Sequence, residues 1–313
     1  MKNIFKTIKK AIVPLLAVAM ISSCGDENNF TPYATSTPEN AANVKFIHTA
    51  VGAAGTNFQV NYFMGADKIT SVGVTVGLPI GMSYGSPYPV VINYALINSG
   101  EQPLTITSPL IAATTTTAAI PAVERFIGKI TTEKGKFYSS FLIGSLPNTT
   151  PVTYSTFQVN DDLSVVNLDK TKAYIRFINV ITNAPVTGYE LGIIKTTSIN
   201  GAATTVTTEI QTYKNVAFKG GDEKFIAIEA QNPTDSRGYQ LQLRVAGSAS
   251  NNPTLAAPAL VANLGNTGAT AFVPRSGRVY TIYCRGFAGG LSAGAPSATV
   301  NAPGISFFSN NNK

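Results

Sequence analysis

The sequence predicts an all-β protein built from two tandem antiparallel β-sandwich domains. Short runs rich in Val, Ile, Tyr, Phe and Thr recur along the chain of 313 residues, with partial alternation of apolar and polar positions; examples are NFQVNYF, YQLQLRVA and VYTIYCRG. Gly, Pro, Asn and Ser separate these runs, and no long stretch has the spacing of an amphipathic helix. The chain also repeats itself once, which indicates two domains.

The repeat consists of two blocks. VKFIHTAVGAAGTNFQV, from Val44, aligns without a gap with IRFINVITNAPVTGYEL, from Ile175, and four of the 17 pairs are identical. GKFYSSFLIG, from Gly135, aligns in the same way with GRVYTIYCRG, from Gly277. Each unit of about 130 residues is long enough to bury a core of its own, so we expect two homologous sandwiches of immunoglobulin-like or transthyretin-like type.

Composition gives the expected boundaries along the chain. A signal peptide is expected first, then a flexible tether rich in Asn, Thr, Pro and Ala, two sandwiches and a C-terminal tail. The junction between the sandwiches is expected near NDDLSVVNLDKT, where polar residues interrupt the apolar pattern. The five expected segments are 1–23 (signal peptide), 24–42 (tether), 43–168 (first sandwich), 169–301 (second sandwich) and 302–313 (tail).

The N-terminal segment has the order of a secretory signal peptide. Four lysines precede the apolar run AIVPLLAVAMIS, and small residues follow it as far as Cys24. The run is too short for a spanning helix, which needs about 20 apolar residues, and Pro14 interrupts it.

Ile21, Ser22, Ser23 and Cys24 resemble a bacterial lipobox. This resemblance implies cleavage before Cys24, lipidation of its thiol with palmitate-like chains, and anchoring to the outer membrane. An ordinary thiol beside a non-lipid signal peptide is the alternative reading. Asp26 and Glu27 resemble an export signal to the outer face of that membrane, so both the cell surface and the periplasmic face stay open; a solvated, charged tether is the alternative.

Charge argues against nucleic acid as a partner. Four of the 23 basic residues lie in the segment expected to be removed, which leaves 19 basic and 16 acidic residues and a net charge of +3. No run of Lys and Arg is interleaved with aromatic residues.

The sequence offers little for catalysis, for a metal or for a cofactor, and none is expected. His48 is the only histidine, and its partner in the repeat is Asn179, which cannot transfer a proton; a structural role for His48 is therefore expected. Cys284 lies on a strand face with Tyr280 and Ile282 and is expected to be a small buried hydrophobe.

Two acidic pairs leave weaker options open. Asp161 and Asp162 at the junction, and Asp222 and Glu223 in KGGDEK, are adjacent in sequence and are expected to be solvated. An oxygen-ligand ion site at the first pair stays conceivable. A glycan-processing enzyme that uses such carboxylates is the least favoured function.

The loop MSYGSPYPV supplies the ligand-binding candidates. Tyr84 and Tyr88 stand among Gly, Ser and Pro and are able to present two rings to a glycan or a peptide. The alternative is that one or both rings close an end of the sandwich.

Several of these segments resemble a bacterial envelope family known only as domain of unknown function 4397. VKFIHTA, YIRFINV, GYQLQLRVAGS and SGRVYTIYCRG carry the resemblance, which spans roughly residues 43 to 290 in two copies. Members commonly have Ser-Pro-Asp-Ala after the first strand, whereas this chain has AVGA at 50–53 and ITNA at 181–184, so a role for that loop's carboxylate is not implied.

The resemblance implies a secreted, lipid-anchored β-sandwich protein of Bacteroidetes type with no established reaction. We therefore expect a non-catalytic binding or adhesion module whose ligand, a glycan or a protein, is not identified by the sequence. A structural subunit resembling fimbrial lipoproteins is the alternative. Those subunits are typically cut at an Arg after the first strand, whereas the first Arg here is Arg125.

Overall fold

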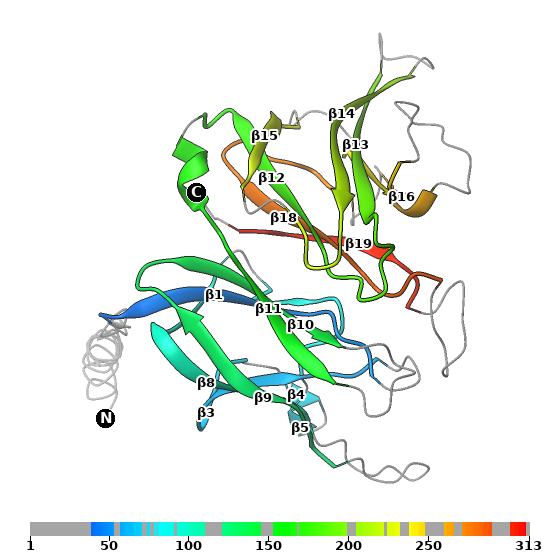
Figure 1. Ribbon diagram of the computed structural model, residues 1–313. Coiled ribbons are helices and arrows are strands. Elements are labelled where there is room, and N and C mark those ends of the chain that lie inside the picture. The colour runs from blue at the N-terminus through cyan, green and yellow to red at the C-terminus, as the bar shows by residue number, and fades with distance from the viewer. Residues whose placement is uncertain are drawn as a thin grey trace, which may run out of the picture. The chain divides into compact units, whose positions relative to one another are not determined.

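The computed structural model in Figure 1 confirms the predicted all-β fold. Contacts divide the chain into two compact units, Met1–Glu39 and Asn40–Lys313, and all the strands described below belong to the second unit. The structure describes residues 39–52, 57–70, 74–75, 78–79, 81–90, 93–109, 121–144, 153–167, 169–198, 205–221, 224–231, 238–247, 260–265, 271–289 and 301–310.

The first repeat forms one sandwich of two sheets (Figure 1). One sheet has the order β11-β10-β1-β6, and β7 pairs with β1 on the same edge as β6. Its strands are β1 (Ala41–His48), β6 (Pro87–Tyr88), β7 (Ala95–Asn98), β10 (Phe137–Gly144) and β11 (Tyr154–Asn160). The facing sheet, in the order β3-β2-β8-β9, consists of β2 (Asn61–Met64), β3 (Asp67–Lys68), β8 (Gly100–Ser108) and β9 (Val123–Thr132). Two short strands, β4 (Val74–Thr75) and β5 (Leu78–Pro79), pair with each other.

The second repeat forms a sandwich with a matching strand order. A 3-10 helix, η2 (Leu163–Asn167), connects it to β11. One sheet, in the order β15-β12-β18-β19, consists of β12 (Lys172–Asn179), β15 (Ile226–Glu229), β18 (Val279–Arg285) and β19 (Gly304–Ser309). The facing sheet, in the order β14-β13-β16-β17, consists of β13 (Tyr189–Ser198), β14 (Thr205–Val216), β16 (Gln240–Val245) and β17 (Leu260–Leu264).

Strand registers relate the two sandwiches residue by residue. Val44 pairs with Tyr138 in the first, and the aligned residues Ile175 and Tyr280 pair in the second. The same correspondence extends to the last strands, where Asp161 donates its N–H to the carbonyl of Phe137 and Asn310 donates its N–H to the carbonyl of Val279, both at 2.7 Å. Residues at matching places are called equivalent below.

Alternation along β1 and β12 sends side chains to two different buried regions. Val44 and Phe46 of β1 lie in the core of the first sandwich, and Ile175 and Phe177 of β12 lie in the core of the second. Successive residues of a strand point to opposite faces of the sheet, so Lys45 and Arg176 leave these cores, yet both are fully buried. Both faces of each strand are therefore covered.

Most strand pairs are antiparallel, but each sandwich contains one parallel pair, β1 with β10 and β12 with β18. These parallel pairs depart from the purely antiparallel sandwiches that the sequence predicts. Parallel neighbours need a long crossover. In the first repeat the chain provides one because, between β1 and β10, it forms β2, β3, β8 and β9 of the facing sheet as well as β6 and β7, which pair with β1.

Two expected boundaries need correction. The tether was expected to reach residue 42, but Ala41 and Ala42 already belong to β1 and are buried. The tail expected at 302–313 contains β19, which pairs with β18 along its length. GISFFS mixes Ile and Phe with Ser and Gly, so the sequence does not show clearly that it is a strand. In the fold the segment pairs with β18, and the side chain of Phe308 is buried.

Within the part of the chain that the structure describes, no helix has the length and apolar character needed to cross a bilayer.

Candidate functional site

The outer faces of the β1 and β12 sheets pack against each other and join the two sandwiches. The contact, called the repeat interface below, has an apolar part in which the rings of Phe141 of β10 and Tyr283 of β18 meet edge to face, at 5.6 Å between centroids. Burial of this many apolar side chains opposes separation of the sandwiches by several kcal/mol at least, at roughly 1.5–3 kcal/mol per side chain. The buried residues of this part are Ile47, Phe141, Ile143, Val159, Ile178, Val180, Tyr283 and Phe308.

Equivalent positions meet one another across the repeat interface. Phe141 and Tyr283 are equivalent, and so are Ile47 and Ile178, which share the apolar cluster. Contact between a surface patch and its own counterpart is the arrangement found in two-fold symmetric dimers. The two repeats therefore dock like the halves of such a dimer.

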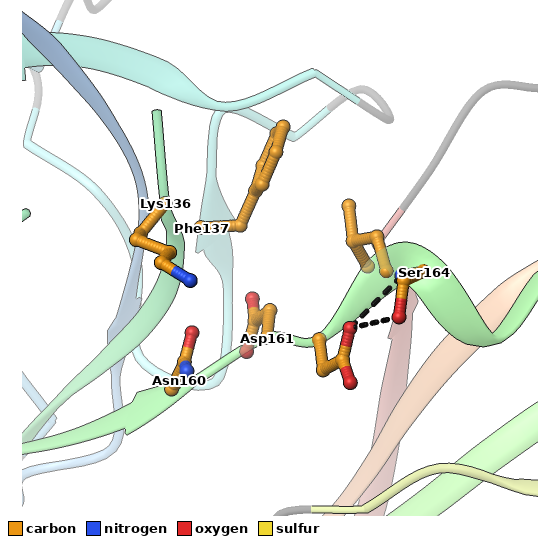
Figure 2. Close-up of a pocket in the computed structure, with 7 residues that line it drawn as sticks. Lys136, Phe137, Asn160, Asp161 and Ser164 are labelled. Atoms are coloured by element: carbon orange, nitrogen blue, oxygen red, sulfur yellow. Dashed lines mark hydrogen bonds between the residues drawn. The ribbon is translucent and has the colours of Figure 1, made fainter. Parts of the chain in front are cut away.

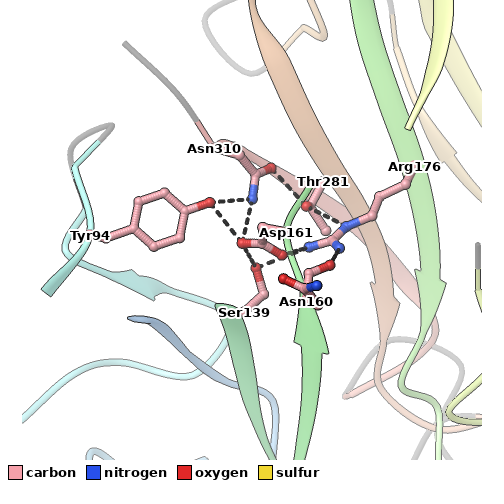
Figure 3. A network of polar contacts seen from close by, with 7 residues as sticks. All are labelled: Tyr94, Ser139, Asn160, Asp161, Arg176, Thr281 and Asn310. Atoms are coloured by element: carbon pink, nitrogen blue, oxygen red, sulfur yellow. Dashed lines mark hydrogen bonds and ion pairs between the residues drawn. The ribbon is translucent and has the colours of Figure 1, made fainter. Parts of the chain in front are cut away.

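The polar part of the interface is centred on Arg176 (Figure 3). Its Nη2 forms an ion pair with Asp161 Oδ1, and both side chains are completely buried. Its Nη1 donates to the carbonyl of Asn160 at 2.9 Å, and its Nε donates to Thr281 Oγ1 at 3.0 Å. Nη2 also donates to Ser139 Oγ at 3.1 Å, so one guanidinium contacts β10 and β11 of the first repeat and β18 of the second.

The second carboxylate oxygen of Asp161 accepts three further hydrogen bonds (Figure 3). Donors are the hydroxyl of Tyr94 at 2.7 Å, the hydroxyl of Ser139 at 2.8 Å and Nδ2 of Asn310 at 3.0 Å. Burial and the adjacent carboxylate of Asp161 raise the pKa of Tyr94 well above its usual value. The hydroxyl of Tyr94 thus stays protonated and acts as a donor.

Lys45, the equivalent of Arg176, lies in the same interface in a different environment. Its Nζ donates to the carbonyl of Pro89 at 3.3 Å and lies over the rings of Tyr94 and Phe308, at 5.4 and 5.5 Å from their centroids. Burial lowers the pKa of Lys45 to about 8, and the negative charge of Asp161 acts in the opposite direction. Asp161 has Asn310 as its equivalent, so the carboxylate of this pair comes from the first repeat alone.

This network specifies how the sandwiches dock more than it stabilises them. A buried ion pair gains little net free energy, because desolvation offsets the attraction, but removal of one partner costs about 3–5 kcal/mol. Side chains from both repeats satisfy Asp161, so only one placement of the sandwiches completes its hydrogen bonds.

A pocket of about 310 Å³ opens beside the network (Figure 2). Asp162, which follows Asp161, is exposed here, and its Oδ1 accepts hydrogen bonds from Ser164 N at 3.0 Å and Ser164 Oγ at 2.6 Å. These bonds lower the pKa of Asp162 and cap the start of η2. The pocket is lined by Lys136, Phe137, Asn160, Asp161, Asp162, Leu163 and Ser164.

The expectation that both junction carboxylates are solvated is therefore wrong for Asp161. Asp161 turns into the repeat interface, whereas Asp162 faces solvent. A signal in the sequence was available: the cation at Lys45 recurs as Arg176 at the centre of an otherwise apolar strand. A buried cation needs a carboxylate partner nearby, and the junction acids were the candidates.

His48 has the structural role that the sequence predicted. It is fully buried, Nε2 lies 2.8 Å from the carbonyl oxygen of Phe58, and burial lowers its pKa to about 4. The equivalent Asn179 donates from Nδ2 to the carbonyl of Val216 at 2.8 Å and accepts from the N–H of Ile181 at 3.0 Å. His48 at the end of β1 and Asn179 at the end of β12 therefore each connect their strand by hydrogen bonds to a neighbouring segment of the same sandwich.

Cys284 is buried in the core of the second sandwich, as expected from its strand face. Its thiol donates to Asn179 Oδ1 at 3.1 Å. Burial raises the pKa of this thiol. The described residues contain no group of three or more His, Cys, Asp or Glu side chains placed to hold a metal ion.

The two candidate tyrosines occupy different places. Tyr88 belongs to β6, pairs with Phe46 and packs against the core of the first sandwich. Tyr84 lies at the repeat interface, with its ring 6.0 Å from the ring of His48 and 4.8 Å from the guanidinium carbon of Arg285. The structure does not bring the two rings together as one platform. Cys24, Asp222 and Glu223 lie outside the described residues.

Comparison with known proteins identifies no family for this chain. No family model matches it, and no curated protein matches it. Among solved structures, it is similar to the fimbrial anchor protein Mfa2 from Porphyromonas gingivalis, with 9% identity, a TM-score of 0.26, and coverage of 86% of this chain and 97% of that chain. A "putative cell adhesion protein" from Bacteroides ovatus gives 14% identity, a TM-score of 0.20, and coverage of 78% and 92% respectively. A protein of the same description from Bacteroides fragilis gives 14% identity, a TM-score of 0.19, and coverage of 87% and 98%.

Proposed function

We propose that this chain is a non-catalytic binding or adhesion module of the bacterial cell envelope, anchored in the outer membrane through a lipid on Cys24. The resemblance to domain of unknown function 4397 is part of this proposal. The ligand is an extracellular glycan or protein. The two sandwiches act as one body, so the loops and strand edges of both are presented in a fixed arrangement.

The repeat interface is the observation that carries the proposal. Its apolar part and the Arg176 and Asp161 network hold the sandwiches in one orientation. A binding surface made from two domains needs such a fixed orientation, because each immobilised element lowers the entropy cost of binding. Loops on a rigid scaffold are the usual place for recognition.

Three chemically reactive side chains among the described residues, those of His48, Asp161 and Cys284, are engaged in the fold, which supports a non-catalytic role. His48 is buried with a lowered pKa, and the Cys284 thiol is buried with a raised pKa. Asp161 is neutralised by Arg176. A general base needs access to substrate and a pKa near the working pH, and neither His48 nor Cys284 combines the two.

Protease shaving of intact cells tests display at the surface. Release of peptides from both repeats is expected, and their protection would place the protein on the periplasmic side. Labelling with an alkyne analogue of palmitate tests the anchor: the wild-type chain should be labelled and Cys24→Ala should not, whereas equal labelling of the two would contradict the anchor.

Attachment assays test the binding role itself. Cells with the protein should attach to a panel of glycans and matrix proteins more strongly than cells in which it is deleted, without release of hydrolysed product. Hydrolysis of a polysaccharide by the purified chain, lost in Asp162→Asn, would favour an enzyme instead. A ladder of stable oligomers in size-exclusion chromatography of residues 25–313 would favour the structural subunit over the binding module.

A further inference from the structure

A second pocket, of about 350 Å³, lies where the two repeats meet. Gly85 of the first repeat borders it, and the remaining lining comes from β17, β18 and β19 of the second. Leu264 and Phe307 give it apolar walls, and Arg285 gives it a positive charge. The hydroxyl of Tyr283 donates to the carbonyl of Gly85 at 2.8 Å, so the first repeat borders one side of the pocket, which is called the seam pocket below.

The guanidinium of Arg285 is held in place from three sides. Its Nε donates to Ser306 Oγ at 3.1 Å, and its carbon lies 4.8 Å from the centre of the Tyr84 ring. Gly85 passes so close that a Cβ at that position would lie 2.7 Å from Nε. Gly85 also has a φ of 78°, which favours glycine. The side chain is thus ordered before any ligand arrives, which lowers the cost of binding one.

This half-buried cation has no ionic partner. Among the described residues, no carboxylate lies within ion-pair distance of Arg285, whereas the buried Arg176 and Arg244 each have one. A guanidinium has five N–H donors; Ser306 accepts from Nε and Tyr84 interacts with the same group, so further Nη hydrogens remain for a ligand. The Tyr84 ring packs beside this guanidinium, and its hydroxyl is buried outside the pocket lining. Burial raises the pKa of Tyr84, and the charge of Arg285 acts in the opposite direction.

The opposite end of the repeat interface shows that the fold does not need these polar groups. Register and hydrogen bonding make Ile143 the equivalent of Arg285, Phe157 the equivalent of Ser306, and Phe218 the equivalent of Tyr84. Those three side chains belong to the apolar part of the interface. Apolar side chains alone fill the equivalent place there, so Arg285, Ser306 and Tyr84 are polar features of this end of the interface only.

We propose that the seam pocket binds a carboxylate carried by an apolar group. The guanidinium of Arg285 offers a carboxylate the paired, charge-assisted hydrogen bonds that it prefers. Leu264 and Phe307 contact the apolar group. The pocket has the size of small-ligand sites, about 300–1,000 Å³. Two sources share this chemistry: the C-terminus of a peptide that ends in an apolar residue, and a free aryl or alkyl acid. The inference rests on the proposed binding function and names the ligand class for it.

Calorimetric titration of the full-length protein in mild detergent tests the inference. The probes are N-acetyl-Ala-Phe with a free carboxylate, the same dipeptide as its C-terminal amide, and 3-phenylpropionate. We expect the free dipeptide to bind at least tenfold more tightly than the amide, and binding to weaken with salt. Tighter binding of the dipeptide than of 3-phenylpropionate identifies a peptide terminus as the source, and the reverse order identifies a free acid.

Variants locate the binding at the pocket. Arg285→Met should abolish it. Arg275→Met, at an exposed turn, is the matched control with the same change in charge and should bind like the wild type. Arg285→Lys keeps the charge but not the two-pronged donor and should bind at least fivefold more weakly. Equal affinity for acid and amide, no binding of either acid at millimolar concentration, or binding that survives in folded Arg285→Met would overturn the proposal. These results leave surface display and attachment untouched, so they are distinct from failure of the proposed function.

Discussion

Replacement of Asp161 by Asn tests the central ion pair with almost no change in shape. The carboxylate accepts from Arg176, Tyr94, Ser139 and Asn310. The hydroxyls of Tyr94 and Ser139 can rotate to accept from the new amide, but Arg176 and the amide nitrogen of Asn310 can only donate. Asp161→Asn therefore leaves the buried guanidinium of Arg176 without its counter-charge. It also places the new amide N–H groups next to groups that can only donate.

The expected cost is about 3–5 kcal/mol in the free energy of unfolding, which is the range for loss of one partner from a buried ion pair. At roughly 2–4 °C per kcal/mol for a protein of this size, the melting temperature should fall by about 6 °C or more. Circular dichroism at increasing temperature measures this fall. Asp162→Asn is the matched control, since Asp162 is exposed and Asn also caps helices; it should cost less than about 1 kcal/mol.

A swapped variant separates charge from shape. In Asp161→Asn with Asn310→Asp the network keeps one carboxylate, moved to the equivalent position, and the melting temperature should recover part of the loss. A melting temperature of Asp161→Asn within 1 °C of the wild type would refute the reasoning, because the guanidinium would then not depend on this carboxylate.

Three further predictions concern titration and access. Burial lowers the pKa of Lys45 to about 8, so the charged side chain destabilises the folded protein most below pH 8, and this destabilisation disappears as the pH rises toward 10.5. Lys45→Met should therefore have a higher melting temperature than the wild type at pH 7. A difference in melting temperature that stays constant from pH 7 to 10 would contradict this. The pKa of His48 is lowered to about 4, so its contribution to stability is complete above pH 6.5 and is lost as the pH falls through 4. Between pH 6.5 and 4, the free energy of unfolding should therefore fall by about 3 kcal/mol less in His48→Asn than in the wild type. Urea titrations at each pH measure this difference. The Cys284 thiol, buried and with a raised pKa, should react with a thiol reagent only in denaturant, and rapid labelling of the native protein would show that the core is open.

The sequence predicted the parts of the fold that depend on local pattern. Alternating runs located β1, β10, β12 and β18, and the gap-free alignment of Val44 with Ile175 agrees with the strand registers. Burial of His48 and Cys284 followed from the strand faces on which they lie. These features are set by neighbours along the chain or by the period of a strand, so a single sequence contains them.

Contacts between distant segments were beyond the sequence. The parallel pairs and the pairing of β19 depend on the path of the whole chain. The recurrence of a cation at Lys45 and Arg176 indicates that a buried carboxylate is needed, but the choice of Asp161 depends on how the two sandwiches dock. The different surroundings of Tyr84 and Tyr88 have the same cause, because Arg285, which contacts Tyr84, lies 201 residues further along the chain.

The division of charge across the repeat interface makes the two halves of the chain non-interchangeable. Lys45 and Asp161 come from the first half, whereas Arg176 and Asn310 come from the second. A chimera with two copies of the second half would enclose two guanidinium groups and no carboxylate, and one with two copies of the first would enclose two acids opposite two lysines. Only the natural pairing of unlike halves brings a single carboxylate to the guanidinium. The two repeats of one chain therefore contact each other as two different subunits of a heterodimer would.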